Sequence, residues 1–478
     1  MKIRRAIIFL SLLFAVALLQ RCSKNPASSQ QEIVSALQST VNAIMPDVAK
    51  LRGLDFIRPV HIAATTRSAY GAYMQKQITQ AFSSSELQGL SKEYAQMGFL
   101  TEADTPLIKI LIDYYSGFPA AYYVPGTDSM YILTDANTDD NTIAHELTHA
   151  LQDQNLDFSM TIFPDYSHFS SDARLAQTSL IEGDAMFTEY AYAFSKAYPA
   201  SSISPFDSSR MVGDYYKNKL TSATYPFDAP LFLNVRGMSP YLLGMSYIGA
   251  RYAASSNWSG VNALFTISMS PRSSATINEE SAALIRYFEF HAIQELLVGS
   301  QRSISFADDD NAGFALLLGL FYGALDTARV SRSLDWSGDR YTFVKYANQP
   351  YGTLVWALAF ANADGAGYAF GKVDSLLRNR RLGGLTAAVD SLADSTGGGV
   401  TYTYAAALDT AQVRRTGNQV WWLENTGSLT RPIMSILTAQ QTLQSPPMPT
   451  HASAIPVTLS SGAKKAAVTG LLKHLFKR

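Results

Sequence analysis

The chain has 478 residues, and 47% of them are hydrophobic, which is enough apolar material for one large domain or for two to three ordinary ones. Its 38 Lys and Arg residues are balanced by 39 Asp and Glu, so the formal net charge is -1. A chain without excess positive charge has no long-range field that attracts nucleic acid or an anionic membrane surface. The composition therefore excludes a disordered chain and argues against nucleic acid as a partner.

The first 22 residues have the pattern of an export signal. Three basic residues precede an apolar run, Ala6 to Leu19, which is short for a membrane span but typical of a signal peptide. Cys22, the only cysteine, follows in LLQRC, which resembles the end of a bacterial lipoprotein signal, where the cysteine is acylated. We expect a lipoprotein anchored through Cys22 in the bacterial cell envelope, facing the periplasm or the outside. Residues 23–31 would be the tether of this lipoprotein. The alternatives to a lipoprotein are an uncleaved N-terminal anchor and ordinary secretion.

The next segments predict helices beside a small sheet. LRGLDFIRPVHIAATT is typical of a helix end followed by a short strand near Val60–Ala63, and a helical stretch continues to about Tyr114. Two β-rich runs then flank the sequence PGTD at 125–128, which favours a hairpin turn. The second run, Ser129–Leu133, ends shortly before the most informative stretch of the chain.

That stretch is TIAHELTHALQDQ, Thr142 to Gln154, and it is predicted to be helical. Acidic and polar residues at 139–142 can cap the helix, and the apolar residues after them recur at helical spacing. His145 and His149 then project from one face, since residues four apart differ by about 40° in azimuth and about 6 Å in height. This is the arrangement that a tetrahedral zinc ion needs from its first two ligands.

Glu146 is predicted to be a general base. It lies about 100° round the helix from His145, so it can reach a water on the metal more easily than the metal itself. Such a water has its pKa lowered towards about 7, and a carboxylate beside it can take its proton and return one to a leaving amine. In a chain with seven histidines the motif is expected by accident less than about once in a hundred sequences of this kind, which favours this interpretation over a solvated helix.

The third metal ligand is expected on the next helix, where SLIEGDAMF supplies Glu182. A His2Glu site of this kind keeps an open fourth position. His168, in the loop between the two helices, is the alternative ligand. Because ligand histidines usually donate their other N–H to a carboxylate or carbonyl, Asp184 is expected to be a partner of the site or a helix-packing residue. Glu189 returns to the face of Glu182 about 10 Å further along.

Residues 201–440 are predicted to form a mainly helical region that completes the cleft. Its helical segments are Pro240–Ala253, Ser281–Leu297 and Ala312–Ser333, and strands are expected at Gly397–Ala406 and Gln419–Leu423. Residues 441–478 have the composition of a Pro/Ser-rich linker followed by a basic tail.

The quoted motifs resemble a group of exported bacterial and archaeal metallopeptidases of the glutamate-zinc (gluzincin) type. The resemblance is carried by HELTHALQDQNLDF and SLIEGDA, and less specifically by LRGLDFIRPV, GFPAAYYVPGTDSMYIL, SPYLLGMSYIGA, SPRSSATI, LDWSGDRYTF and GNQVWWLEN. It implies an α+β, predominantly helical fold, with a zincin-like catalytic region at 32–200. It also implies one zinc ion held by His145, His149 and Glu182, with Glu146 as base.

The same resemblance draws attention to Tyr241 in SPYLLG and to Arg340 in WSGDRY. A tyrosine hydroxyl or an arginine near zinc could stabilise an oxyanion or hold a substrate carboxylate. Helix packing for Tyr241 and a turn ion pair between Arg340 and Asp339 are the alternatives.

Two hypotheses for the function follow. The first is a zinc-dependent metallopeptidase-like hydrolase whose partner is a peptide or protein substrate. The second is an exported lipoprotein that binds peptide or glycan through a non-catalytic zincin-like domain. Glu146 favours the first hypothesis, because a purely structural metal site has no need of a base there.

Overall fold

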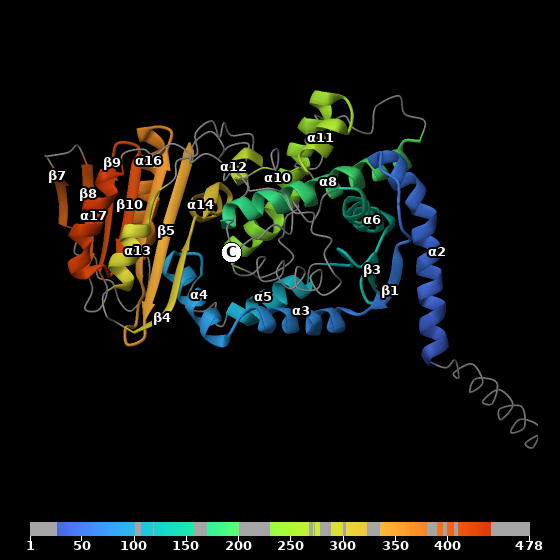
Figure 1. Ribbon diagram of the computed structural model, residues 1–478, viewed down its shortest axis with the longest axis horizontal. Coiled ribbons are helices and arrows are strands. Elements are labelled where there is room, and N and C mark those ends of the chain that lie inside the picture. Colours follow the sequence, from blue (N-terminus) through green and yellow to red (C-terminus); the bar gives the residue numbers. More distant parts are fainter. Residues whose placement is uncertain are drawn as a thin grey trace, which may run out of the picture.

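In the computed structural model the chain is α+β, and its described residues contain two separate sheets (Figure 1). A three-stranded sheet lies on the right of Figure 1 and a seven-stranded sheet on the left, with the long helices α8 (Ser171–Ala197) and α10 (Leu231–Ser255) between them. The structure describes residues 26–100, 107–117, 119–156, 170–199, 230–266, 271, 273–277, 288–299, 303–322, 335–379, 390–394, 399–405 and 410–440.

The N-terminal helix α2 (Pro26–Arg52) begins inside the stretch 23–31 that is expected to be a tether. Proline suits the first position of a helix, because its missing N–H has no partner there and its φ is already helical. The apolar side chains Val41, Ile44 and Val48 of α2 are buried in the cluster that covers the three-stranded sheet. Cys22 and the predicted signal lie outside the described residues.

The small sheet has the strand order β1-β3-β2. Strand β1 (His61–Thr65) runs parallel to β3 (Ser129–Leu133), and β2 (Ala121–Val124) pairs with β3 in antiparallel fashion, which confirms the predicted hairpin. The turn places two residues in the left-handed region, Gly126 with φ 75° and Asp128 with φ 52°. Glycine and aspartate adopt that conformation more readily than most residues.

The stretch expected to be helical up to about residue 114 forms three helices, α3 (Arg67–Ala81), α4 (Ser84–Gln96) and α5 (Leu107–Gly117). Ser83 separates the first two because its side chain caps α4. The Glu86 N–H donates to Ser83 Oγ at 3.2 Å, and the Ser83 N–H donates to Glu86 Oε2 at 2.8 Å. This reciprocal pair satisfies backbone donors that the first turn of a helix otherwise leaves free.

The helix predicted to carry the two histidines is α6 (Asp140–Asn155). Asp139 caps it by accepting a hydrogen bond from the Thr142 N–H at 2.8 Å, and Ser170 caps α8 in the same way. Helix α8 packs against both α6 and α10. The histidine helix and the glutamate helix are therefore neighbours, as the sequence predicts.

Helices α8 and α10 touch through their backbones. A Cβ on Gly183 would lie 2.2 Å from the carbonyl carbon of Gly244, and a Cβ on Gly244 would lie 2.0 Å from the carbonyl oxygen of Ser179. Only glycine permits so close an approach. Helix α10 begins at Leu231, earlier than the expected start at Pro240. The shorter helices α11 (Ser259–Ala263), α12 (Ser274–Ile277) and α14 (Gly313–Tyr322) pack around this pair.

The larger sheet has the order β4-β5-β6-β10-β9-β8-β7, and every neighbouring pair is antiparallel. Its strands are β4 (Ile304–Asp310), β5 (Trp336–Tyr346), β6 (Thr353–Phe360), β7 (Asp390–Asp394), β8 (Gly399–Ala405), β9 (Thr410–Thr416) and β10 (Gln419–Glu424). The two strands expected in this region are β8 and β10. The region expected to be mainly helical, residues 201–440, contains this sheet in addition to its helices.

Helices cover the larger sheet on both faces, which explains why its central strands escape prediction. Alternate residues of β6 pack into two different hydrophobic clusters. One cluster includes α16 (Ala363–Asn379), and the other includes α13 (His291–Val298) and α17 (Thr430–Ala439). The short helix η5 (Gly427–Leu429) precedes α17. All eight residues of β6 are buried. A strand buried on both faces lacks the polar–apolar alternation by which half-buried strands are predicted.

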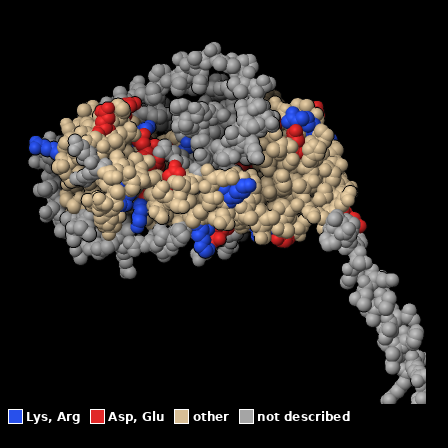
Figure 2. Space-filling view, turned by 60° about the horizontal axis from the view of Figure 1, so that its bottom comes forward, with Lys and Arg blue, Asp and Glu red and all other residues tan. Residues whose placement is uncertain are grey.

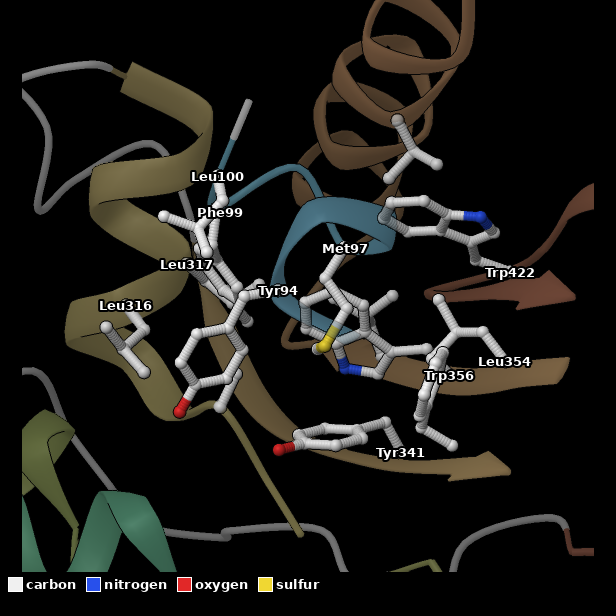
Figure 3. Packing of buried hydrophobic residues seen from close by; sticks show 14 of the residues in the cluster. Tyr94, Met97, Phe99, Leu100, Leu316, Leu317, Tyr341, Leu354, Trp356 and Trp422 are labelled. Atoms are coloured by element: carbon white, nitrogen blue, oxygen red, sulfur yellow. The ribbon is translucent and has the colours of Figure 1, made fainter. Parts of the chain in front are cut away.

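The main hydrophobic core joins early and late parts of the chain (Figure 3). The rings of Trp356 and Trp422 are stacked with centroids 5.6 Å apart, and Phe99 lies 6.3 Å from Trp356. Tyr94 and Met97 lie in the same cluster. The division expected at residue 200 therefore does not coincide with a boundary between two hydrophobic cores.

The described surface carries both signs of charge. Basic and acidic side chains are interspersed among other residues on the face shown in Figure 2, in keeping with the balanced composition. Within the described ranges, no helix combines the length and the apolar character needed to cross a membrane.

Candidate metal centre

Three predicted ligands meet between α6 and α8. His145 Nε2 lies 3.2 Å from His149 Nε2 and 3.3 Å from Glu182 Oε2, and His149 Nε2 lies 3.4 Å from the same oxygen. Ligand atoms that surround a tetrahedral metal at about 2.0–2.1 Å are about 3.3–3.4 Å apart. The three atoms thus have the spacing of one face of such a tetrahedron, and the group could hold a metal ion.

The helical period explains the histidine pair, and the packing of α8 on α6 brings Glu182 to it. His145 is buried, while His149 and Glu182 are partly buried. The close approach of two imidazole nitrogens is unfavourable when both carry lone pairs, unless a cation lies between them or one is protonated. His168, the alternative ligand, lies outside the described residues.

The electrostatics of the site favour charge separation between the histidines and the carboxylate. Burial lowers the pKa of His145, but hydrogen bonds to Glu182 and Glu189 outweigh it and hold that pKa well above its usual range. For Glu182, burial acts to raise the pKa, but His149 and His145 bring it down to about 2. A carboxylate that stays ionised down to this pH remains available as a metal ligand.

Glu146 is held beside the ligands by the edge strand β2. Its Oε2 accepts a hydrogen bond from the Tyr123 N–H at 2.8 Å, and the Tyr123 hydroxyl donates to Asp153 Oδ2 at 2.8 Å. Burial raises the pKa of Glu146, and His149 and His145 oppose this rise. The sequence gives no sign of the contact with Tyr123, because it depends on how the hairpin packs on α6.

Glu189 orients the first histidine. His145 Nδ1 lies 3.1 Å from Glu189 Oε2. An ionised carboxylate is only an acceptor, so Nδ1 must carry a proton, and in the neutral ring Nε2 then has the lone pair that a metal ion needs. Glu189 thus fills the role expected of Asp184, and its position seven residues after Glu182 on one helix face is the signal in the sequence.

Gln152 contacts the second histidine. His149 Nδ1 lies 2.9 Å from Gln152 Oε1, and Gln152 Nε2 donates to Asp184 Oδ2 at 2.8 Å and to the Ile181 carbonyl at 3.0 Å. Asp184 therefore reaches the ligand only through Gln152. Sequence reasoning misses Gln152, although its place one turn after His149 on α6 is compatible with this contact.

Tyr241 lies next to the ligands. Its ring centroid is 6.0 Å from that of His145, with an angle of 29° between the planes. Burial, reinforced by the nearby charges of Glu182 and Glu146, raises the pKa of Tyr241 well above its usual range. The phenol is therefore a neutral hydroxyl near the ligand triangle.

Arg340 lies elsewhere, so its predicted place in the site is wrong. It lies in β5, where its guanidinium forms an ion pair with Asp309 of β4. The neighbouring Asp310 accepts from the Ser171 N–H at 3.0 Å, which places this end of the sheet at the start of α8. Glu182 lies further along α8, roughly 16 Å from Ser171 at about 1.5 Å per residue.

The alternative for Arg340, a turn ion pair with Asp339, is also wrong. Asp339 accepts from the Ala312 and Gly313 N–H groups at 2.8 and 2.9 Å and from Trp356 Nε1 at 3.0 Å. The segment around both residues is a strand and not a turn.

Comparison with protein-family models, curated proteins and solved structures gave no match for this chain. Three possible ligand atoms converge at the site. The carboxylate of Glu146, which accepts a hydrogen bond from a backbone N–H, lies on the helix of the two histidines, and the neutral Tyr241 lies beside His145. Such an arrangement can bind a cation and move a proton next to it.

Proposed function

We propose that the protein is a zinc-dependent, metallopeptidase-like hydrolase of the gluzincin type, with a zincin-like catalytic region within residues 32–200. The observation that carries the proposal is the ligand triangle of His145, His149 and Glu182, whose edges of 3.2 to 3.4 Å suit a tetrahedral ion. Two imidazoles and one carboxylate form the donor set of many catalytic zinc sites, which keep a fourth position for water or substrate.

A zinc ion bound there would lower the pKa of a water molecule and polarise a carbonyl oxygen. Glu146 accepts a proton from the water that attacks the peptide carbonyl and returns it to the leaving amine. The Tyr123 N–H, 2.8 Å from Glu146 Oε2, holds that carboxylate in place. The Tyr241 hydroxyl donates a hydrogen bond to the oxygen that gains negative charge.

The proposed setting is the bacterial cell envelope, with a lipid on Cys22 and a peptide or protein as substrate. This part of the proposal rests on the basic residues, the apolar run and the LLQRC sequence at the N-terminus. Incorporation of labelled fatty acid that is lost in Cys22→Ser would support it. Equal labelling of both proteins would exclude Cys22 as the acylated residue.

Metal content and hydrolysis test the catalytic proposal separately. The purified protein should contain about one zinc ion per chain, and His149→Ala and Glu182→Ala should each lose it. Glu146→Gln should retain zinc but lose hydrolysis of a peptide library, while a chelator should abolish hydrolysis by the wild type. Glu295→Gln is a matched control, because Glu295 is an exposed carboxylate on α13.

Each outcome has a definite meaning. A wild-type protein without bound zinc would refute the metal site. Unchanged hydrolysis in Glu146→Gln would exclude Glu146 as the base. Zinc retained by the wild type without any hydrolysis would favour an exported protein that binds peptide or glycan through the same domain.

A further inference from the structure

A chain of buried contacts runs from the N-terminal helix to the second metal ligand. Arg52, the last residue of α2, has a fully buried side chain whose Nε lies 2.8 Å from Asp184 Oδ1 and 3.1 Å from Oδ2. Asp184 Oδ2 accepts from Gln152 Nε2 at 2.8 Å, and Gln152 Oε1 lies 2.9 Å from His149 Nδ1. None of these groups needs water to complete the connection.

The direction of the Gln152 amide determines which nitrogen of His149 carries a lone pair. A neutral imidazole has one N–H and one acceptor nitrogen. With Oε1 facing His149, Nδ1 must hold the proton, and Nε2 is free to bind a metal. If the amide were reversed, its NH2 would face Nδ1, and a neutral ring would then carry its proton on Nε2, where it blocks metal binding.

The surroundings of Gln152 favour only the productive direction. Its NH2 group has two acceptors, Asp184 Oδ2 and the Ile181 carbonyl oxygen, at 2.8 and 3.0 Å. Reversal would place an amide oxygen against both of these acceptors, in a site where Gln152 is fully buried. Such a group loses two hydrogen bonds and meets like partial charges, which is costly at low dielectric.

Arg52 keeps Asp184 in the position that this arrangement requires. A buried carboxylate needs a partner for its charge, and the guanidinium supplies it. Arg52 is itself fixed, because Nη2 donates to Asn262 Oδ1 at 2.9 Å and its Cζ lies 4.1 Å from the centroid of the Trp258 ring. The ion pair thus joins α2, α8 and the α11 region at one point.

We propose that Gln152 is a positioning residue for the metal ligand His149, and that the buried Arg52–Asp184 ion pair fixes the direction of its amide. This inference rests on the proposed function, since it concerns the same metal site. The other ligand, His145, does not need such a device, because Glu189 offers an acceptor whichever way its carboxylate turns. The docking of α2 is therefore coupled to the metal affinity of the site.

The test measures the zinc dissociation constant of the full chain by competition with a chelator, together with the melting temperature of the metal-free protein. Gln152→Leu removes the acceptor and should weaken zinc binding about 10–100-fold. Gln152→Glu alone places like charges side by side, and Asp184→Asn alone leaves the amide direction undetermined, so each should also bind zinc more weakly.

The combined variant Gln152→Glu/Asp184→Asn separates positioning from general packing. It exchanges the acid and the amide, keeps the total charge of the two residues, and again presents an acceptor oxygen to His149 Nδ1. It should bind zinc more tightly than either single variant. Gln96→Leu is the matched control: Gln96 is also buried and bonds Gly352 at 2.8 and 3.0 Å, so its loss should lower the melting temperature without changing zinc affinity.

Two results would overturn the inference alone: wild-type zinc affinity in Gln152→Leu, or a combined variant that does not bind zinc more tightly than both single variants. The second comparison remains decisive if Gln152→Leu does not fold. Failure of the wild type to bind zinc would instead overturn the proposed function, and this inference with it.

Discussion

Asp172 is a buried carboxylate whose replacement should stabilise the protein in a pH-dependent way. It lies in the first turn of α8 and is 1% exposed. Its Oδ1 accepts hydrogen bonds from the Ser274 N–H at 3.0 Å and from the Ser274 hydroxyl. Ser273 and Ser274 both act to lower the pKa of this carboxyl group, but burial acts more strongly in the opposite direction. Burial raises the pKa of Asp172 to about 6.

The sign and size of the effect follow from this pKa. The ordinary value is 3.8, so in the unfolded chain the carboxyl loses its proton at lower pH than in the folded protein. The folded state is therefore penalised as pH rises from 3.8 to about 6, and the penalty stays constant above that pH. The difference between the two values corresponds to about 3 kcal/mol.

Asp172→Asn removes the charge and keeps an oxygen for Ser274. The new amide also lowers the stability of the folded state, because it buries an unpaired N–H and interacts less with the helix dipole than a carboxylate does. The cost of the unpaired N–H does not depend on pH. We therefore compare the effect of the substitution on the free energy of unfolding at pH 8 with its effect at pH 4. We expect this difference to favour the variant by about 2.5 kcal/mol, because at pH 4 more than half of the unfolded chains have already lost the proton of this carboxyl.

Urea unfolding of the metal-free protein at both pH values measures this difference, because a chelator removes any contribution from bound metal. Asp113→Asn is the control, since Asp113 has a 60% exposed side chain on α5 and should show almost no pH-dependent gain. Equal effects of Asp172→Asn at pH 4 and pH 8 would show that the buried carboxylate carries no penalty, and the reasoning would be wrong.

Three further predictions concern α8 and the metal site. Glu189→Gln should weaken zinc binding about 10–100-fold in a chelator competition, because an amide can turn its NH2 towards His145 Nδ1, and an unchanged constant would contradict this role. Gly183→Ala should destabilise the protein by about 1–3 kcal/mol in urea unfolding. Gly371→Ala is its control, since a Cβ there meets nothing within 4 Å, and equal stabilities of the two variants would refute the close helix contact. Arg340→Ala should leave zinc content and peptide hydrolysis unchanged. Loss of either would show that Arg340 contributes to the site.

The residues of the candidate metal centre could be predicted because local rules place them. His145 and His149 share a face through the helical period alone, and the helix is capped by Asp139 as the sequence indicates. Glu182 follows from its residue type and from the expectation that consecutive helices pack together. The predicted hairpin is likewise confirmed, because turn residues at 125–128 have a local signature.

The remaining features depend on tertiary contacts without a local signature. Arg52 meets Asp184 across a long stretch of chain, and no spacing rule connects them. Strands β5 and β6 lie in the centre of a sheet covered on both faces, so their composition resembles that of a buried helix. Arg340 lies on β5, and its pairing with Asp309 depends on the contact between β5 and β4, although its sequence context suggests a turn.

The packing of helix α8 determines the position of Glu182 and of the neighbouring Tyr241 together. Glu182 directly precedes Gly183, whose backbone touches Gly244 of α10. Tyr241 lies about one helical turn before Gly244. A backbone contact cannot be adjusted by side-chain rotation, so the glycine pair fixes α10 against α8 more rigidly than larger residues would. The spacing between the carboxylate ligand and the tyrosine hydroxyl is therefore determined by helix packing, and a change at either glycine should disturb both groups together.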